Sequence, residues 1–135
     1  MSIRLKTLYA DVAKDLGLGT GNERLSDAFP RAVNRALDEL AVAGDVAGKF
    51  THVSSIDDTV SDLSDHYEYM LYAGVAYYLI RMGFKPGDSR IASVIYDDSD
   101  KRWEQAKADY IMDVDNLAAA DRTESVIGRK LADED

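Results

Sequence analysis

Hydrophobic residues recur every three or four positions in four stretches of the chain, the spacing that places side chains on one face of a helix. Between the second and third stretches this periodicity is lost. The pattern therefore predicts a mainly α protein, a small bundle of about four helices with a short β-hairpin or an extended loop between helices 2 and 3. The predicted helices cover residues 3–16, Ser26 or Asp27 to Gly44, Asp65 to Gly83, and Asp88 or Ser89 to about Ala120.

The third stretch, Asp65 to Gly83, is the most apolar part of the chain and contains no charged residue between Tyr69 and Ile80. A helix that is apolar nearly all round must be covered on several sides. Asp65, followed three residues later by Glu68, predicts a capping box at its start. Gly83 predicts its end.

The two sides of this central helix differ in character. Leu71, Val75 and Leu79 lie on one face, which we expect to pack against the other helices. Tyr69, Tyr72 and Tyr77 lie on the other side, as candidates for contact with the loop or a neighbouring subunit. An aromatic stripe of this kind also suits stacking on a base or a cofactor, but basic residues are not interleaved with it, so packing is the better interpretation.

The first two helices carry conventional start and stop signals. Ser2 is expected to cap the first helix and Gly17 to end it. The glycine-rich run GLGTGN at 17–22 allows a phosphate-loop interpretation, but no strand is predicted before it and no Gly-Lys-Ser/Thr follows, so we interpret it as a connector. Pro30 is expected in the first turn of the second helix, where a missing N–H is harmless.

Residues 45–64 are rich in β-formers and turn residues. A short strand is predicted over 49–56, and the Asp57–Val60 turn would reverse the chain into a hairpin. A single hairpin is only marginally stable, so it needs support from the helices or from another subunit. The larger side chains and the histidine of this segment are candidate interface residues: Phe50, His52, Val53 and Ile56.

The last helix is interrupted in pattern by the run Asp97-Asp98-Ser99-Asp100, which contains no apolar residue. We expect one continuous helix of about 45 Å that runs to Ala120; the alternative is two helices meeting at Ser99 or Asp100. We divide the chain into a helical domain, 1–120, and a C-terminal extension, 121–135. The extension would fray alone and dock in an assembly, through the interface candidates Val126, Ile127 and Leu131.

Composition narrows the class of protein. The 135 residues suit one domain, and a hydrophobic fraction of 46% indicates a folded chain. The absence of cysteine excludes disulfides and thiolate chemistry. The longest apolar run is too short to cross a bilayer, and the N-terminus lacks the apolar core of a signal peptide. We therefore expect an intracellular protein, or one that belongs to an assembly made inside the cell.

The formal net charge of −9 argues against general nucleic-acid binding, which needs clustered Lys and Arg. It is compatible with an acidic wall past which DNA slides, although solubility alone is the simpler explanation.

Candidate chemistry is sparse. The two histidines, His52 and His66, have no metal-ligand spacing around them. The acidic runs near Asp57 and Asp97 lack the ligand order of a calcium loop, so caps and turns explain them better. We predict no catalytic residue, no metal and no cofactor. An enzyme built on His66 with Asp62 or Asp65 is the open alternative.

The order of these parts resembles the head-to-tail connector, or adaptor, proteins of tailed bacteriophages. The resemblance is carried by AVNRALDELAVAG, a β-prone segment with Asp-rich turns, the apolar helix YEYMLYAGVAYYLIRMG, and a long final helix with RWEQAKADYIMDV. It covers most of residues 1–120 and includes no catalytic motif. The run DDSD and the C-terminal extension have no counterpart in that pattern.

The resemblance implies a structural protein of the virion neck, assembled in the host cytoplasm. Such adaptors form a ring, usually of twelve copies, on the portal protein. They extend the DNA channel without sequence-specific binding and present a surface to the next neck or tail protein. The alternative function is a small intracellular helical interaction or regulatory module that binds a partner through its aromatic helix.

Overall fold

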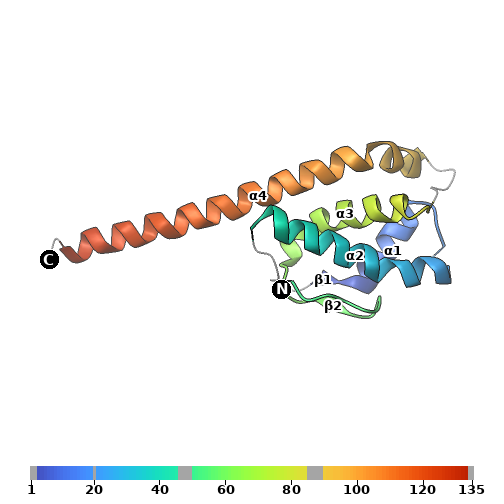
Figure 1. Ribbon diagram of the computed structural model, residues 1–135, viewed down its shortest axis with the longest axis horizontal. Helices are drawn as coiled ribbons and strands as arrows, with labels where there is room; N and C mark the ends of the chain where they lie inside the picture. The colour runs from blue at the N-terminus through green and yellow to red at the C-terminus, as the bar shows by residue number, and fades with distance from the viewer. Residues whose placement is uncertain (1–2, 20, 46–49, 85–89, 134–135) are drawn as a thin grey trace.

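The computed structural model describes residues 3–19, 21–45, 50–84 and 90–133, and within the last helix it describes side chains as far as Asp115. Figure 1 shows a helical bundle from which the last helix projects far beyond the others. The mainly α class predicted from the sequence is confirmed. The elements in chain order are β1 (Ile3–Arg4), α1 (Leu5–Asp15), α2 (Glu23–Ala43), β2 (Thr59–Val60), the 3₁₀ turn η1 (Asp65–Tyr67), α3 (Glu68–Arg81) and α4 (Arg90–Asp133).

The central helix α3 packs between α2 and α4, and α1 contacts α3 and α4. Its Leu71, Val75 and Leu79 are fully buried, as predicted from their spacing. Phe29 of α2 and Trp103 of α4 are among the largest buried side chains of the same core. The bundle therefore buries one face of each long helix around α3.

A two-stranded antiparallel sheet joins the N-terminus to the segment between α2 and α3. Ile3 pairs with Val60 and Arg4 pairs with Thr59. The extended-loop alternative for this segment is thus the one observed, and the strand predicted over 49–56 does not form in its described part, 50–56. The helix predicted from residue 3 begins instead at Leu5, because Ile3 and Arg4 pair with Val60 and Thr59 of β2, a distant partner that local periodicity does not reveal.

The start of α2 differs from the prediction. The helix begins at Glu23, where the Asn22 side chain accepts a hydrogen bond from the Leu25 N–H. Pro30 consequently lies well inside the helix, where it removes one backbone hydrogen bond. Pro30 is buried among apolar residues, and this packing offsets part of that cost. Asn22, three residues before the buried Leu25, was therefore a stronger signal for the start of this helix than Ser26 or Asp27.

The start of the third helical segment differs from the prediction. Ser64, not Asp65, caps the 3₁₀ turn, because its hydroxyl accepts from the His66 N–H. The 3₁₀ turn leads into α3, which begins at Glu68 with no side-chain cap. The predicted capping box between Asp65 and Glu68 is therefore not the arrangement observed.

The helices differ in which residue takes the left-handed conformation at their C-terminal ends. Gly17 and Gly83 have positive φ angles of 73° and 98° and end α1 and α3 as predicted. After Gly83, the Phe84 N–H donates to the Leu79 carbonyl at 3.2 Å, which closes a Schellman motif. At the end of α2, Asp45 and not Gly44 takes the left-handed conformation, with φ 55°.

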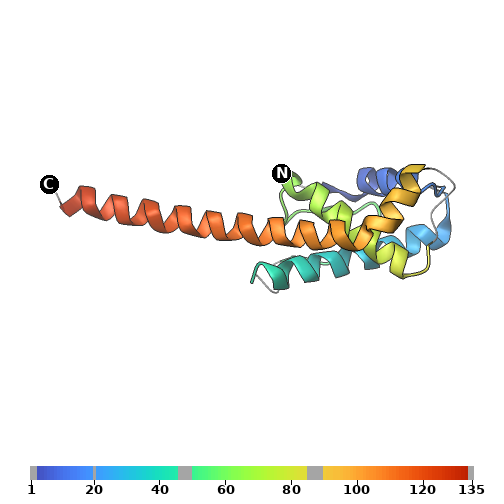
Figure 2. The same ribbon diagram turned by 90° about the horizontal axis from the view of Figure 1, so that it is seen from above.

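Helix α4 is continuous across the acidic run, as predicted, and extends past Ala120 to Asp133. Its first turns are inclined to the rest of the helix in Figure 2. Ser99 is buried in this run, and its hydroxyl donates to the Tyr96 carbonyl at 3.2 Å, a contact that often bends helices. The buried stripe of α4 passes through Ala92, Ile95 and Ser99, whereas the apolar Ile91 and Val94 are exposed. The predicted caps Ser2, Asp88 and Ser89 lie outside the described residues.

Candidate functional site

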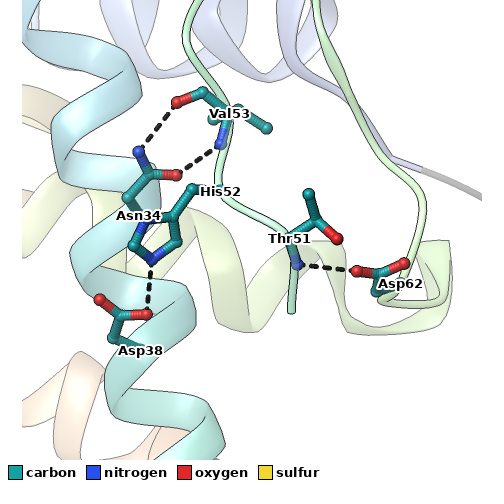
Figure 3. Close-up of polar contacts among 6 residues, drawn as sticks. All are labelled: Asn34, Asp38, Thr51, His52, Val53 and Asp62. Atoms are coloured by element: carbon teal, nitrogen blue, oxygen red, sulfur yellow. Dashed lines mark hydrogen bonds and ion pairs between the residues drawn. The ribbon is translucent and has the colours of Figure 1, made fainter. Parts of the chain in front are cut away.

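The segment before β2 is attached to α2 by polar contacts, shown in Figure 3. The Asn34 side chain both donates to the Val53 carbonyl and accepts from the Val53 N–H, each at 2.8 Å. One residue earlier, His52 Nε2 lies 2.7 Å from Asp38 Oδ1. The Thr51 N–H donates to Asp62 at 2.7 Å, which ties the two ends of the segment together. These contacts hold the segment in one position.

This attachment divides the interface residues predicted in the segment. Phe50 and Val53 are buried against the chain's own core, and Ile56 is half-buried and packs on it. His52 is exposed. Of these four residues, therefore, His52 offers the most side chain to a partner, and the segment acts mainly as a cover for the bundle.

The acidic residues of the segment organise turns. Asp58 accepts hydrogen bonds from the N–H groups of Ser54 and Ser55 and from the Ser54 hydroxyl. The backbone hydrogen bonds from Ser54 and Ser55 lower the pKa of the Asp58 carboxyl below its usual value. Among the described residues, no group of three or more His, Asp or Glu side chains is placed to hold a metal ion. His66 is exposed and packs edge-on against Tyr67.

The three tyrosines predicted as an interface on α3 lie in different surroundings. Tyr69 is 55% exposed. Tyr77 is half-buried, and its ring lies between Tyr78 and Arg81. The Tyr72 hydroxyl donates to Asp15 Oδ2 at 2.6 Å; burial, together with this hydrogen bond, raises the pKa of Tyr72. Tyr72 therefore links α3 to α1, whereas Tyr69 is available at the surface.

Tyr69 and Tyr72 line a groove of about 690 Å³ between α3 and α4. The side chains of Ala73, Ala76 and Ala106 also line it, and because these are small, the two helices leave space between them. We call this hollow the α3–α4 groove. Its polar rim comes from α4: Asp98, Ser99, Lys101, Arg102, Gln105 and Asp109.

A second hollow of about 450 Å³ lies beside the groove and shares Tyr72, Ile95 and Arg102 with it. It adds Ile91, which is 62% exposed, and Arg90 at the start of α4. Together the two hollows follow α4 from Arg90 to Asp109. From here the α3–α4 groove denotes both.

A polar cluster between α2 and α4, which was not predicted from the sequence, holds the α4 side of the groove in place. The Trp103 indole N–H donates to Glu39 of α2, and Lys107 Nζ lies 3.6 Å from the same carboxylate. Burial alone raises the pKa of Glu39, but hydrogen bonds from Tyr78 and Trp103 and the charge of Lys107 outweigh it and lower that pKa. The cluster fixes the rotation of α4, and hence which of its residues face the groove.

Beyond the groove, α4 leaves the bundle. Val114 is the last described side chain that packs on the core, and Met112 beside it is 65% exposed. Figures 1 and 2 both show the helix continuing alone from there to its C-terminal end. The predicted interface residues Val126, Ile127 and Leu131 belong to this part and lie outside the residues whose side chains are described.

Comparison with known proteins gave no relative: no family model matches the chain, and neither curated proteins nor solved structures produced a match. None of the helices in the described part of the chain is long and apolar enough to span a membrane.

Proposed function

We propose that this chain is a structural subunit of the head-to-tail adaptor of a tailed bacteriophage. Copies of it form a ring, dodecameric by analogy with the family it resembles, beneath the portal protein. The ring extends the DNA channel and joins the capsid to the next neck or tail protein. The subunits assemble in the host cytoplasm and end in the virion neck.

The observation that carries the proposal is the projection of α4. The helix is 44 residues long, or about 66 Å, and its described contacts with the bundle end near Val114. Most helical stability in proteins comes from packing of an apolar face, not from the helix alone. A helix that extends this far from its own bundle is therefore suited to a protein that works inside an assembly.

Two further features support an architectural role. His52 and His66 are exposed, Asp58 is used in a turn, and the groove between α3 and α4 has an apolar floor. The net charge of −9 suits a channel wall to which DNA does not adhere.

The test is assembly with the portal protein of the same phage. Native mass spectrometry and negative-stain imaging of the mixture should show a ring of this chain on the portal ring. A chain that stays monomeric and forms no complex with the portal would contradict the proposal.

The second candidate function is a small intracellular interaction module, and the specific observation in its favour is the α3–α4 groove with exposed Tyr69. Grooves between helices commonly bind an amphipathic helix of another protein. This candidate predicts a stable monomer or dimer that ignores the portal, so the same mixing experiment separates the two functions.

A further inference from the structure

The α3–α4 groove has the dimensions of a seat for a single helix. It is bordered on one side by α3 and on the other by α4, with alanines at its floor. Along α4 it runs from Arg90 to Asp109, which corresponds to about 30 Å of helix. Apolar side chains at its edges, including Tyr69 and Ile91, are more than half exposed.

The projecting part of α4, residues 116–133, has a matching length of about 27 Å. Its sequence repeats apolar residues on one side of a helix, at Leu117, Ala120, Ile127 and Leu131. Leu117 and Ala120 continue the three- and four-residue steps of Trp103, Ala106, Tyr110 and Val114, by which α4 packs on its own bundle. Ile127 and Leu131 resume the same side two turns later, past the polar Thr123 and Glu124. The apolar stripe thus continues past the point where the chain's own bundle ends.

A continuous α4 cannot place its C-terminal part in its own groove, because the groove is built on the first half of the same helix and the C-terminal part runs away from it (Figures 1 and 2). Only another molecule can supply the helix for this groove. Equally, only another molecule can cover the stripe of residues 116–133.

Charge favours a second copy of this chain as that molecule. The chain as a whole carries −9, so two copies repel each other over most of their surfaces. The groove is an exception, because its three acidic and three basic side chains balance. Residues 116–133 also contain three acidic and three basic residues. The charged residues that line the groove are Asp15, Asp98, Asp109, Arg90, Lys101 and Arg102.

We infer that residues 116–133 of α4 from one copy lie in the α3–α4 groove of another copy. The inference deepens the proposed function, on which it rests, by naming the contact that joins neighbouring subunits. The donated helix and the accepting groove are different surfaces of the chain, so the contact is able to propagate from copy to copy and close into a ring.

The absence of cysteine in the natural chain makes a site-specific cross-linking test direct. One full-length chain carries Ile127→Cys in the projecting helix, and a second, with a distinguishable tag, carries Gln105→Cys in the groove. Mixed without portal and treated with a short bis-maleimide, they should form a cross-linked pair of the two tagged chains. The matched control replaces Gln105→Cys with Ala108→Cys, which is exposed on the same helix but does not line the groove.

The expected result is a several-fold faster cross-link to position 105 than to position 108. Adding Leu131→Asp to the Ile127→Cys chain should lower that rate several-fold, because it would bring a charge against the apolar groove. This change lies outside the bundle, and an unchanged thermal melt checks the fold. Equal rates at positions 105 and 108, or no effect of Leu131→Asp, would overturn the inference.

The outcomes also separate this contact from the proposed function. A cross-link to position 105 in a chain that forms no ring with the portal supports the contact and removes the adaptor function. A ring on the portal without that cross-link keeps the adaptor function and removes the contact.

Discussion

At the scale of single residues, the tightest point of the fold is Gly74 in the middle of α3. A Cβ added there would lie 2.7 Å from the Trp103 ring and 2.8 Å from the Cβ of Ala36. Neither neighbour can move away easily. The Trp103 side chain is hydrogen-bonded to Glu39, and Ala36 is fully buried in α2. Gly74 therefore sets the separation of the three central helices.

Gly74→Ala should destabilise the protein by about 1–2 kcal/mol, because overpacking costs more than the roughly 1 kcal/mol that alanine gains in a helix interior. The measurement is the free energy of unfolding in urea. Gly19→Ala is the matched control, since nothing lies within 4 Å of a Cβ at that position and the change should be nearly neutral. A Gly74→Ala protein as stable as the wild type would contradict the packing described here.

Tyr72 couples stability to alkaline pH. Burial and the hydrogen bond to Asp15 raise its pKa above the usual value near 10. The folded state therefore favours the neutral phenol, so this contribution is fully present below about pH 10 and is lost as the pH rises through the folded-state pKa.

Tyr72→Phe should lower stability at pH 7 by about 1 kcal/mol, the usual value of one hydrogen bond. It should also reduce the loss of stability above about pH 10, since one raised phenol pKa is removed. Urea unfolding from pH 7 to 11 measures both effects. Tyr77→Phe is the control, because no hydrogen bond to a carboxylate is described for it. An unchanged alkaline slope in Tyr72→Phe would show that this phenol is not the source.

At the scale of elements, local periodicity predicted which segments are helical, whereas contacts between distant residues determined where the helices begin and how they are rotated. The faces of α2 and α3 follow from 3.6-residue repeats, which any helix of that sequence must respect. In contrast, β1 exists because Ile3 meets Val60, and no local signal contains that pairing. The long α4 was predicted as continuous, but its rotation was not, because burial of Ser99 instead of Val94 depends on where the bundle meets it.

The candidate site, too, could be predicted only as far as local periodicity allowed. Tyr69 and Tyr72 were predicted as surface aromatics because an over-apolar helix leaves some rings uncovered. The α4 side of the groove, with Arg102 and Gln105, was not predicted, since polar residues on a helix are normally assigned to solvent. The packing of α4 on the bundle, with Trp103 hydrogen-bonded to Glu39, turns them toward α3.

The attachment of the 50–54 segment depends on one side chain, Asn34 of α2. Asn34→Ala should cost about 1–3 kcal/mol, because it leaves both backbone groups of the buried Val53 without their partner. Hydrogen exchange of the Val53 amide should accelerate in this variant. Asp38→Asn, which alters only the exposed contact with His52, is the control and should change stability by less than about 1 kcal/mol. Slow exchange at Val53 in Asn34→Ala would contradict this role.

At the scale of the whole molecule, shape and charge have opposite effects on the association of copies of this chain. The projecting helix and the α3–α4 groove favour contact between copies, whereas the net charge of −9 opposes it. The salt concentration decides which effect is larger, because charges separated by more than a Debye length interact weakly. The Debye length is about 8 Å at physiological ionic strength and about 3 Å at 1 M salt. Apolar contact in a charge-balanced groove is not weakened by the same salt.

Self-association of the chain should therefore strengthen as the salt concentration rises from 0.05 to 1 M, a range over which the Debye length falls from above 10 Å to about 3 Å. Sedimentation velocity at fixed protein concentration measures it. Asp57→Asn with Asp65→Asn removes two exposed acids away from the groove, so this variant should associate at lower salt than the wild type. If salt instead dissociates the copies, ion pairs and not apolar packing join them, and the contact must lie on a charged surface outside the groove.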